Sequence, residues 1–313
     1  MRGRSASEAR FREAKSFAGG VFEALLVALA LELVDRPRWW RGYLVSRLIP
    51  PQIHPVSLFY RAVSPLAHGG GLARGVAVAA TAPLGALAVW GLAQAIAAVP
   101  PPLSYLAEGY LLKLTFSITH ILYTCMRHVG TPAMRQVAQQ FVRRDLSNAD
   151  PRLVNSACLE AAAESLVDSF VSPLFWYLLL GLPGAWLQRL VNTLDGLVGF
   201  REKGALGAPS AYMDTILNYV PARVAALLIL AAGGFKRLSI LRHRRQVPSV
   251  NAGWPIAALA AALGVRLEKA GHYTVGVGDL PDADAVRRGL WIVAAAAVAW
   301  ALAAVTLAAL IRT

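Results

Sequence analysis

The chain has 313 residues, of which 56% are hydrophobic and only 16% are charged, and its mean hydropathy is +0.49. A water-soluble domain would carry about a quarter charged residues, so this composition excludes an ordinary soluble protein and favours an integral membrane protein with several helices. The net charge of +13 would suit a nucleic-acid partner, but basic loops flanking apolar spans account for it, and we expect membrane lipid and no nucleic acid.

The amino-terminal half alternates basic segments with apolar ones. In chain order we expect a basic stretch (1–16), a short apolar helix (18–34), a basic loop (35–74), a spanning helix without charge (75–99) and a second span (109–126). Glu23 and Glu32 interrupt the short helix, which also falls below the roughly 20 residues that a span needs. We therefore expect that helix to be interfacial or re-entrant, and the second span to contain Lys113 and His120.

The carboxy-terminal half contains most of the polar blocks. In chain order we expect a basic segment (127–152), an acidic helix continued by an apolar run (155–182), a second apolar helix (to about 200), a polar loop (201–210), a short helix (212–219), an apolar helix (221–232), a basic cluster (236–245), a short helix (to 265), a polar loop (266–288) and a last span (289–311). The Pro183–Gly184 pair should break the long apolar stretch. Hydropathy thus predicts about five spans.

The charge of the loops predicts the orientation. The segments 1–16, 35–74, 127–152 and 236–245 are basic, whereas residues 99–108 contain no lysine or arginine. The positive-inside rule then places the basic loops in the cytoplasm. We expect an all-α, polytopic helical bundle in the cell membrane, with polar cytoplasmic loops, short re-entrant or interfacial helices and an active site facing the cytoplasm. Residues 1–313 are expected to form a single membrane-embedded catalytic domain.

Acids recur at helix-face spacing over a short part of the chain. Glu160, Glu164 and Asp168 are four residues apart, so they share one helix face and repel one another unless neutralised. Asp168 also adjoins an apolar run, where an acid is costly unless it faces a cavity or a partner. Two carboxylate–amide pairs follow, Asn192 with Asp195 and Asp214 with Asn218. One such pair could be a helix cap, but three groups together indicate hard oxygen ligands for magnesium.

Other kinds of site find little support. The six histidines form no His-x-x-x-His pair, and Cys125 and Cys158 lack a metal-binding spacing, so we expect no zinc site and two buried thiols. Neither a phosphate-binding Gly-x-x-x-x-Gly-Lys loop nor a Gly-x-Ser-x-Gly elbow is present. Basic residues beside the acids could clamp phosphate or anchor the membrane edge. These are Arg143, Arg144, Arg189, Arg201, Lys203 and Arg223.

Several blocks together resemble one known family. The run EAAAESLVDSFVSPLFWYLLLGLPGAWLQRLVNTLDGLVGF resembles the central signature of the adenosylcobinamide-phosphate synthases of cobalamin biosynthesis. The segments LALELVDRP, HPV at His54, RRDLS, YMDTILNYVPAR and NAGWPIAALAAALGVRLEK resemble further blocks of that family, in the family's order. Two departures occur, because Thr215 stands where the family usually has a second acid and Glu32 where it has aspartate.

The resemblance implies an integral membrane ligase that uses ATP and Mg²⁺. It would join aminopropanol phosphate to the free carboxylate of adenosylcobyric acid. On the matching blocks, the expected catalytic residues are Glu164, Asp168, Asp195 and Asp214, and the expected magnesium ligands are Glu160, Glu164, Asp168 and Asp195. The expected substrate-binding residues are His54, Arg144, Asp145, Asn192, Arg201, Lys203, Asn218, Arg223, Asn251 and Trp254. A homo-oligomer, or an association with other cobalamin-pathway membrane enzymes, is left open.

Two alternatives remain at this stage. An intramembrane prenyltransferase also binds magnesium and diphosphate through paired acids on helices, although its usual Asp-rich blocks are absent here. A transporter would place polar groups at broken helices, but the polar blocks here cluster in loops on one predicted side and no inverted repeat is visible.

Overall fold

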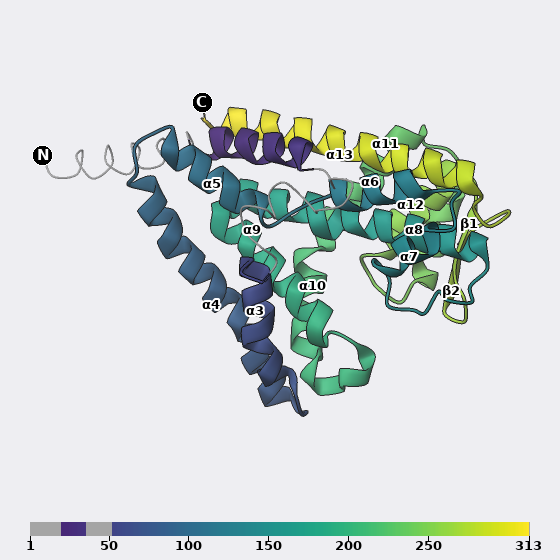
Figure 1. Ribbon diagram of the computed structural model, residues 1–313, viewed down its shortest axis with the longest axis horizontal. Coiled ribbons are helices and arrows are strands. Elements are labelled where there is room, and N and C mark those ends of the chain that lie inside the picture. Colours follow the sequence, from purple (N-terminus) through teal and green to yellow (C-terminus); the bar gives the residue numbers. More distant parts are fainter. Residues whose placement is uncertain (1–19, 36–51, 313) are drawn as a thin grey trace, which may run out of the picture.

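The computed structural model describes residues 20–35 and 52–312, and it confirms the expected helical class (Figure 1). A helix occupies residues 20–34. The labelled elements are α3 (Pro55–Val63), η1 (Ser64–Ala67), α4 (Leu72–Ala97), α5 (Leu103–Lys113), α6 (Thr119–His128), α7 (Met134–Gln139), α8 (Pro151–Leu166), the π-helical turn η2 (Val167–Val171), α9 (Ser172–Val198), η3 (Arg201–Leu206), α10 (Ala208–Leu217), α11 (Tyr219–Gly233), η4 (Leu238–Gln246), α12 (Gly253–Leu263), β1 (Arg266–Lys269), β2 (Tyr273–Gly276) and α13 (Ala283–Arg312).

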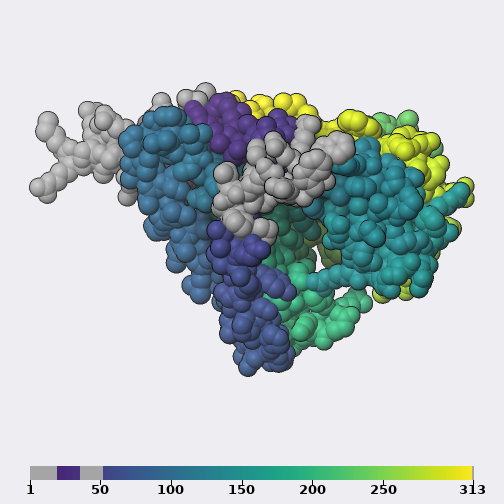
Figure 2. Space-filling model, viewed as in Figure 1, coloured from purple at the N-terminus to yellow at the C-terminus, as the bar shows by residue number. Residues whose placement is uncertain are grey.

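Within the described residues, three helical stretches are long and apolar enough to cross a membrane, namely Leu72–Ala97, Pro151–Val198 and Ala283–Ile311. A fourth would be α10 with α11, which bend by 49° at their junction. The outer faces of α4 and α13 are apolar, since Leu84 and Trp291 are 64% and 68% exposed. Such faces suit lipid. In Figure 2, α4 and α3 project away from the body that contains α13 and α8.

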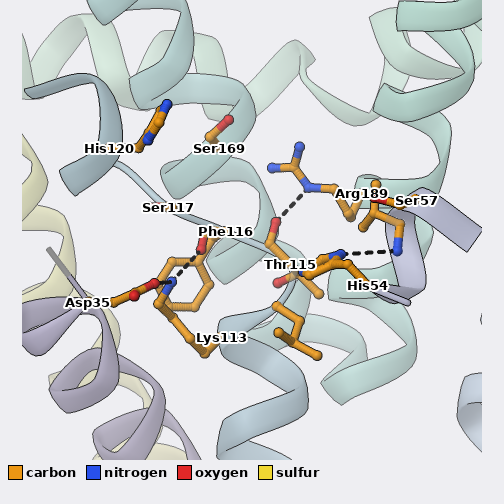
Figure 3. Close-up of a pocket in the computed structure, with 12 residues that line it drawn as sticks. Asp35, His54, Ser57, Lys113, Thr115, Phe116, Ser117, His120, Ser169 and Arg189 are labelled. Atoms are coloured by element: carbon orange, nitrogen blue, oxygen red, sulfur yellow. Dashed lines mark hydrogen bonds and ion pairs between the residues drawn. The ribbon is translucent and has the colours of Figure 1, made fainter. Parts of the chain in front are cut away.

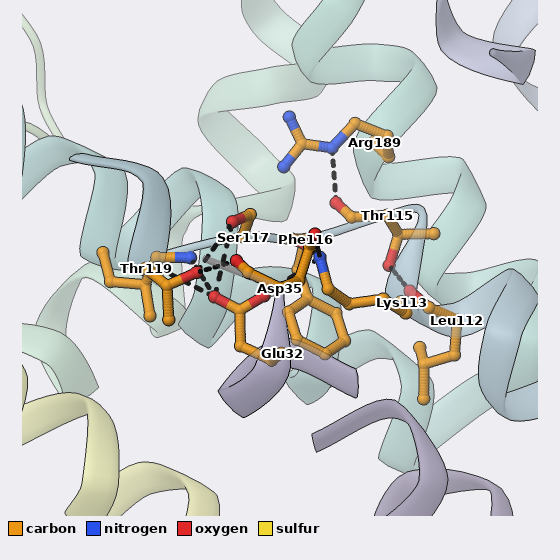
Figure 4. Close-up of polar contacts among 10 residues, drawn as sticks. Glu32, Asp35, Leu112, Lys113, Thr115, Phe116, Ser117, Thr119 and Arg189 are labelled. Atoms are coloured by element: carbon orange, nitrogen blue, oxygen red, sulfur yellow. Dashed lines mark hydrogen bonds and ion pairs between the residues drawn. The ribbon is translucent and has the colours of Figure 1, made fainter. Parts of the chain in front are cut away.

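The expected second span over residues 109–126 is wrong. The chain there is divided into α5 and α6, of 11 and 10 residues, joined by a non-helical link. Lys113 ends α5 and is almost completely buried, with its ammonium 3.0 Å from a carboxylate oxygen of Glu32 and 3.0 Å from one of Asp35 (Figure 4). Continuing the helix through this point would leave a charge in apolar surroundings, which is costly. The break lets the lysine meet both acids.

The stretch Pro151–Val198 reverses direction at Gly181. This glycine has φ 66° and ψ −158°, a conformation that is almost restricted to glycine. In a straight helix, residues 168 and 189 would lie about 30 Å apart. Instead the Arg189 guanidinium donates to the Asp168 carbonyl at 3.0 Å, and the Gln188 amide donates to the same oxygen at 3.3 Å. The expected break at Pro183–Gly184 therefore lies two residues earlier, and α8, η2 and α9 form a helical hairpin.

The closest approach of the two hairpin arms requires a second glycine. A Cβ atom on Gly184 would lie 2.4 Å from the carbonyl oxygen of Trp176 in the opposite arm. At the tip, Leu179 and Leu180 are 58% and 50% exposed, so the tip is apolar on its outer surface. The hairpin therefore has an apolar tip and a base where Asp168 and Arg189 lie at the same level.

The expected polar loop over residues 266–288 contains two strands that the sequence did not predict. β1 and β2 pair antiparallel, with Arg266 opposite Gly276 and Lys269 opposite Tyr273. Ser156 on α8 holds this hairpin, because its hydroxyl accepts from the Glu268 N–H at 2.7 Å. Both cysteines are fully buried, as expected.

Replacing Gly181 by alanine should disrupt the helical hairpin. A Cβ atom at this φ and ψ should cost on the order of 1–3 kcal/mol, and we expect a lower melting temperature in detergent. Gly196 is the matched control, because it lies in the same helix and a Cβ atom there would meet nothing within 4 Å. The measurement is a thermal unfolding scan of both variants. Equal melting temperatures for Gly181→Ala and Gly196→Ala would contradict a glycine-dependent reversal.

Candidate active site

The base of the hairpin gathers polar groups from three helical elements. Asp168 comes from η2, Asn192 from the returning arm of α9, and Asp214 from α10. The side-chain amides of Asn192 and Asn218 both donate to one carboxylate oxygen of Asp214, at 3.3 Å and 2.9 Å. The two carboxylate–amide pairs found in the sequence are therefore interlocked in space. We call Asp168, Asp195, Asp214, Asn192 and Asn218 the acid cluster.

A partly buried arginine holds the acid cluster together. Arg189 donates to the backbone carbonyls of Thr115 and Asp168, at 2.6 Å and 3.0 Å, and to the side-chain oxygen of Asn192 at 3.2 Å. It thereby connects the link between α5 and α6 to both arms of the hairpin. Arg189 would lose these hydrogen bonds if its side chain turned away to bind a substrate. We therefore assign it a positioning role.

The charge of the acid cluster is unbalanced. Asp168 lies close enough to Asp214 and Asp195 for their charges to interact, with Arg189 as a nearby cation. Among the described residues, however, no group of three or more histidine, cysteine, aspartate or glutamate side chains has the geometry to hold a metal ion. The four expected magnesium ligands thus do not form a ready-made protein cage. A cation here would need oxygens from water or from a substrate, which is the usual way in which Mg²⁺ is held.

Glu160 lies in a separate group of side chains. Its carboxylate is paired with Arg144 at 3.1 Å and accepts from the hydroxyls of Ser156 at 2.8 Å and Tyr273 at 2.7 Å. Burial and the Glu160 charge raise the pKa of Tyr273, so this phenol remains a donor. Glu164, one turn along α8, lies between Glu160 and Asp168 and interacts electrostatically with both. Both carboxylate oxygens of Glu160 thus accept hydrogen bonds from the protein, Oε1 from Arg144 and Ser156 and Oε2 from Tyr273.

The two consecutive arginines of the RRDLS block have different surroundings. Arg144 is the partly buried partner of Glu160. Arg143 is exposed, stacks on the Phe200 ring with its guanidinium carbon 3.4 Å from the centroid, and donates to the Gly196 carbonyl. Its charge also acts on Asp195. Arg144 is the arginine that the sequence predicts as substrate-binding, whereas Arg143 is the arginine that borders the acid cluster.

A second polar group lies where α10, α11 and α12 meet. Arg223 donates to the Asn251 side-chain oxygen at 3.0 Å, and the Asn251 amide donates to the Thr215 carbonyl at 2.9 Å. Thr215 follows Asp214, so this group is joined to the acid cluster through α10. The Trp254 ring lies near two guanidinium carbons, those of Arg223 at 5.2 Å and Arg244 at 4.3 Å. The expected residues Arg223, Asn251 and Trp254 are thus brought together.

A cavity of about 370 Å³ opens beside the hairpin base (Figure 3). His54 lies in it, together with Ser169 and Arg189 of the hairpin and with Lys113. The pKa of His54 is lowered by burial and by the charges of Lys113 and Arg189. Of the expected substrate-binding residues, only His54 lines this cavity. The sequence offered a signal for Lys113, a lysine in an apolar run, but that signal was interpreted as a tolerated charge in a span.

Three expected substrate-binding residues lie apart from these groups. Asp145 is exposed, and its carboxylate accepts from the N–H and the hydroxyl of Ser147. Arg201 and Lys203 are exposed in η3. In the described part of the chain, no hydrogen bond or ion pair joins the latter two side chains to the acid cluster. Their expected contact with substrate phosphate stays a prediction.

Comparison with known proteins gives the family. The family model described as CobD/Cbib protein matches residues 25–293, which is most of the chain. The chain belongs to the CobD/Cbib family. A relative in Aeropyrum pernix, named probable cobalamin biosynthesis protein CobD, is 40% identical over 274 residues, 81% of this chain and 82% of the relative.

Further members of the CobD/Cbib family match shorter parts of the chain. The probable cobalamin biosynthesis protein CobD of Pyrococcus furiosus is 38% identical over 204 residues, 62% of this chain and 70% of its own. The probable cobalamin biosynthesis protein CobD of Thermococcus kodakarensis is 38% identical over 214 residues, which are 67% of this chain and 72% of that relative. No solved structure matches the chain.

Replacing Arg144 by methionine should destabilise the protein. Glu160 would keep its buried charge without its cationic partner, and such a loss typically costs about 3–5 kcal/mol; because Arg144 is 18% exposed, we expect the low end of that range. The control is Arg143→Met, which removes an exposed side chain and should leave the melting temperature within a few degrees of the parent protein. Thermal unfolding in detergent measures both. Equal stability of the two variants would refute the different roles.

Proposed function

We propose that the chain acts in cobalamin biosynthesis as an adenosylcobinamide-phosphate synthase, a membrane ligase that joins adenosylcobyric acid to aminopropanol phosphate with ATP. The relatives' names support a role in cobalamin biosynthesis. The observation that carries the proposal further is the acid cluster, a concentration of carboxylates at the base of a helical hairpin beside a small cavity. Burying charged groups among apolar helices costs free energy, so their presence here favours a catalytic or binding role for them.

The proposed reaction has two chemical steps. A carboxylate does not react with an amine, so the corrinoid carboxylate first takes the terminal phosphoryl group of ATP, which yields an acyl phosphate and ADP. The amine lone pair then forms the C–N bond, the bond between the acyl carbon and the phosphate oxygen breaks, and phosphate leaves with that electron pair. The nitrogen loses a proton to a nearby base. We assign this role to whichever of Asp168, Asp195, Asp214 and Glu164 does not hold magnesium, since these carboxylates lie close enough for their charges to interact.

The acid cluster suits magnesium in its chemistry, because its donors are carboxylate and amide oxygens. Asp168, Asp195 and Asp214 would hold the ion. When bound, Mg²⁺ would neutralise charge on the transferred phosphoryl group. Arg143, which borders Asp195 and is held by Phe200, would add a positive charge that can meet a phosphate. We place the active site at the cytoplasmic face, where the basic loops are expected to lie.

The direct test is synthesis of the amide product. Purified protein in detergent is incubated with adenosylcobyric acid, aminopropanol phosphate, ATP and Mg²⁺, and mass spectrometry detects adenosylcobinamide phosphate together with ADP. Omission of ATP is the matched control. Failure to form the amide with correctly folded protein would reject the proposed ligase activity.

Asp168→Asn and Asp195→Asn should reduce turnover by about 100-fold or more, because each removes charge that stabilises the transition state. If these carboxylates hold magnesium, the variants should also need more Mg²⁺ to reach half-maximal rate. The control is Asp284→Asn, whose exposed carboxylate pairs with Arg287 far along the chain in α13. Turnover is measured over a magnesium titration in protein of unchanged melting temperature. Rates within a few-fold of the parent protein at low magnesium would remove these acids from the centre.

A further inference from the structure

The cavity beside the hairpin base is small, is open on one side and is lined by distant parts of the chain. Its volume of about 370 Å³ lies near the lower end of the range for small-molecule sites, roughly 300–1,000 Å³. A corrinoid ring or a whole nucleotide would not fit inside. The walls come from residue 35, the start of α3, residues 113–120 and the hairpin base. The cavity therefore suits a ligand of a few non-hydrogen atoms.

The charges around this cavity differ between its two ends. Lys113 and Arg189 are cations, Asp35 is the carboxylate, and His54 and His120 are the remaining titratable groups. Burial lowers the pKa of both histidines, so both are neutral near pH 7. Lys113 is paired with Asp35 (Figure 3) and also with Glu32, which does not line the cavity. The Asp35 charge acts on His120, whereas the charges of Lys113 and Arg189 act on His54, so the His54 end of the cavity favours an anionic ligand.

The wall formed by α3 presents hydrogen-bond donors. The Val56 N–H donates to His54 Nδ1 at 3.3 Å, so Nδ1 is the unprotonated nitrogen of the neutral ring and Nε2 carries the proton. In the first turn of α3, Pro55 has no N–H and the N–H groups of Val56 and Leu58 donate to His54, which leaves the Ser57 N–H for a ligand. The helix dipole adds positive potential there. Ser57, in this first turn, also lines the cavity. An anion in the cavity would thus find the Nε2–H of His54 and the hydroxyl and N–H of Ser57.

We propose that this cavity binds the phosphate of a small phosphomonoester. The inference rests on the proposed function, in which aminopropanol phosphate is that ligand. Ser169 lines the cavity and directly follows Asp168, so a ligand held by its phosphate at α3 lies beside the acid cluster. His54 binds the phosphate, and Arg189 supplies charge while its hydrogen bonds remain with the protein.

The test uses His54→Asp, which separates ligand binding from helix capping. Aspartate is a preferred residue at the start of a helix, so it keeps the cap of α3. It also places a negative charge in the cavity. Binding of aminopropanol phosphate to the purified protein, without ATP, corrinoid or magnesium, is measured by titration calorimetry. We expect at least a tenfold weaker affinity in His54→Asp, and aminopropanol without phosphate should not bind the parent protein.

The matched control is His68→Asp, at an exposed histidine that follows η1 and does not line the cavity. It should bind the ligand as the parent protein does. Equal affinity in His54→Asp and His68→Asp would overturn the proposal, as would equally tight binding of aminopropanol. A short-chain phosphatidic acid that competes as well as aminopropanol phosphate would assign the cavity to lipid headgroups and would also overturn it.

The outcome can be distinguished from that of the proposed function. Specific binding of the phosphomonoester without any amide product would support the cavity assignment and reject the ligase. Amide formation with the same Michaelis constant for aminopropanol phosphate in the parent protein and in His54→Asp would support the ligase and reject the cavity assignment.

Discussion

The reversal of the chain at Gly181 is the constraint on which the polar centre depends. Because the two arms return side by side, Arg189 meets the Asp168 carbonyl although 21 residues separate them in the chain. An unbroken helix would place these groups at opposite ends of a long rod. The glycine conformation, the close contact at Gly184 and the acid cluster are thus parts of one arrangement. The apolar arms bury hydrophobic side chains, and the base of the hairpin holds the acid cluster.

The buried ion pairs of Lys113 provide the opposite wall. Desolvating one lysine and two acids is costly, and removing only one partner from such a group typically costs about 3–5 kcal/mol. These ion pairs have a structural role, because Lys113 ends α5 and residues 114–118 after it are non-helical. The Thr115 carbonyl in that link accepts from Arg189, and the link lines the cavity. Glu32, Asp35 and Lys113 therefore position the arginine that positions the acid cluster.

The sequence predicted features that depend on local pattern. Hydropathy indicated the helical membrane class, and helix spacing together with a Pro–Gly pair placed Asn192 near Asp168. Features that depend on distant partners were missed. Tyr273, which donates to Glu160 from 113 residues away, lies on a strand expected as loop. Lys113 looked like a charge within a span because its partners, Glu32 and Asp35, lie about 80 residues earlier. The choice between Arg143 and Arg144 likewise required the folded neighbours.

The helical hairpin also affects how many times the chain crosses the membrane. A segment that enters a bilayer, turns at an apolar tip and leaves by the face it entered adds no net crossing, whatever its length. Such a path would put the RRDLS segment before α8 and residues 201–203 after α9 in one aqueous compartment. Arg143, which reaches across to Gly196 and Phe200, is the physical sign of that adjacency. Water-soluble reactants would then arrive and depart on the same side of the membrane.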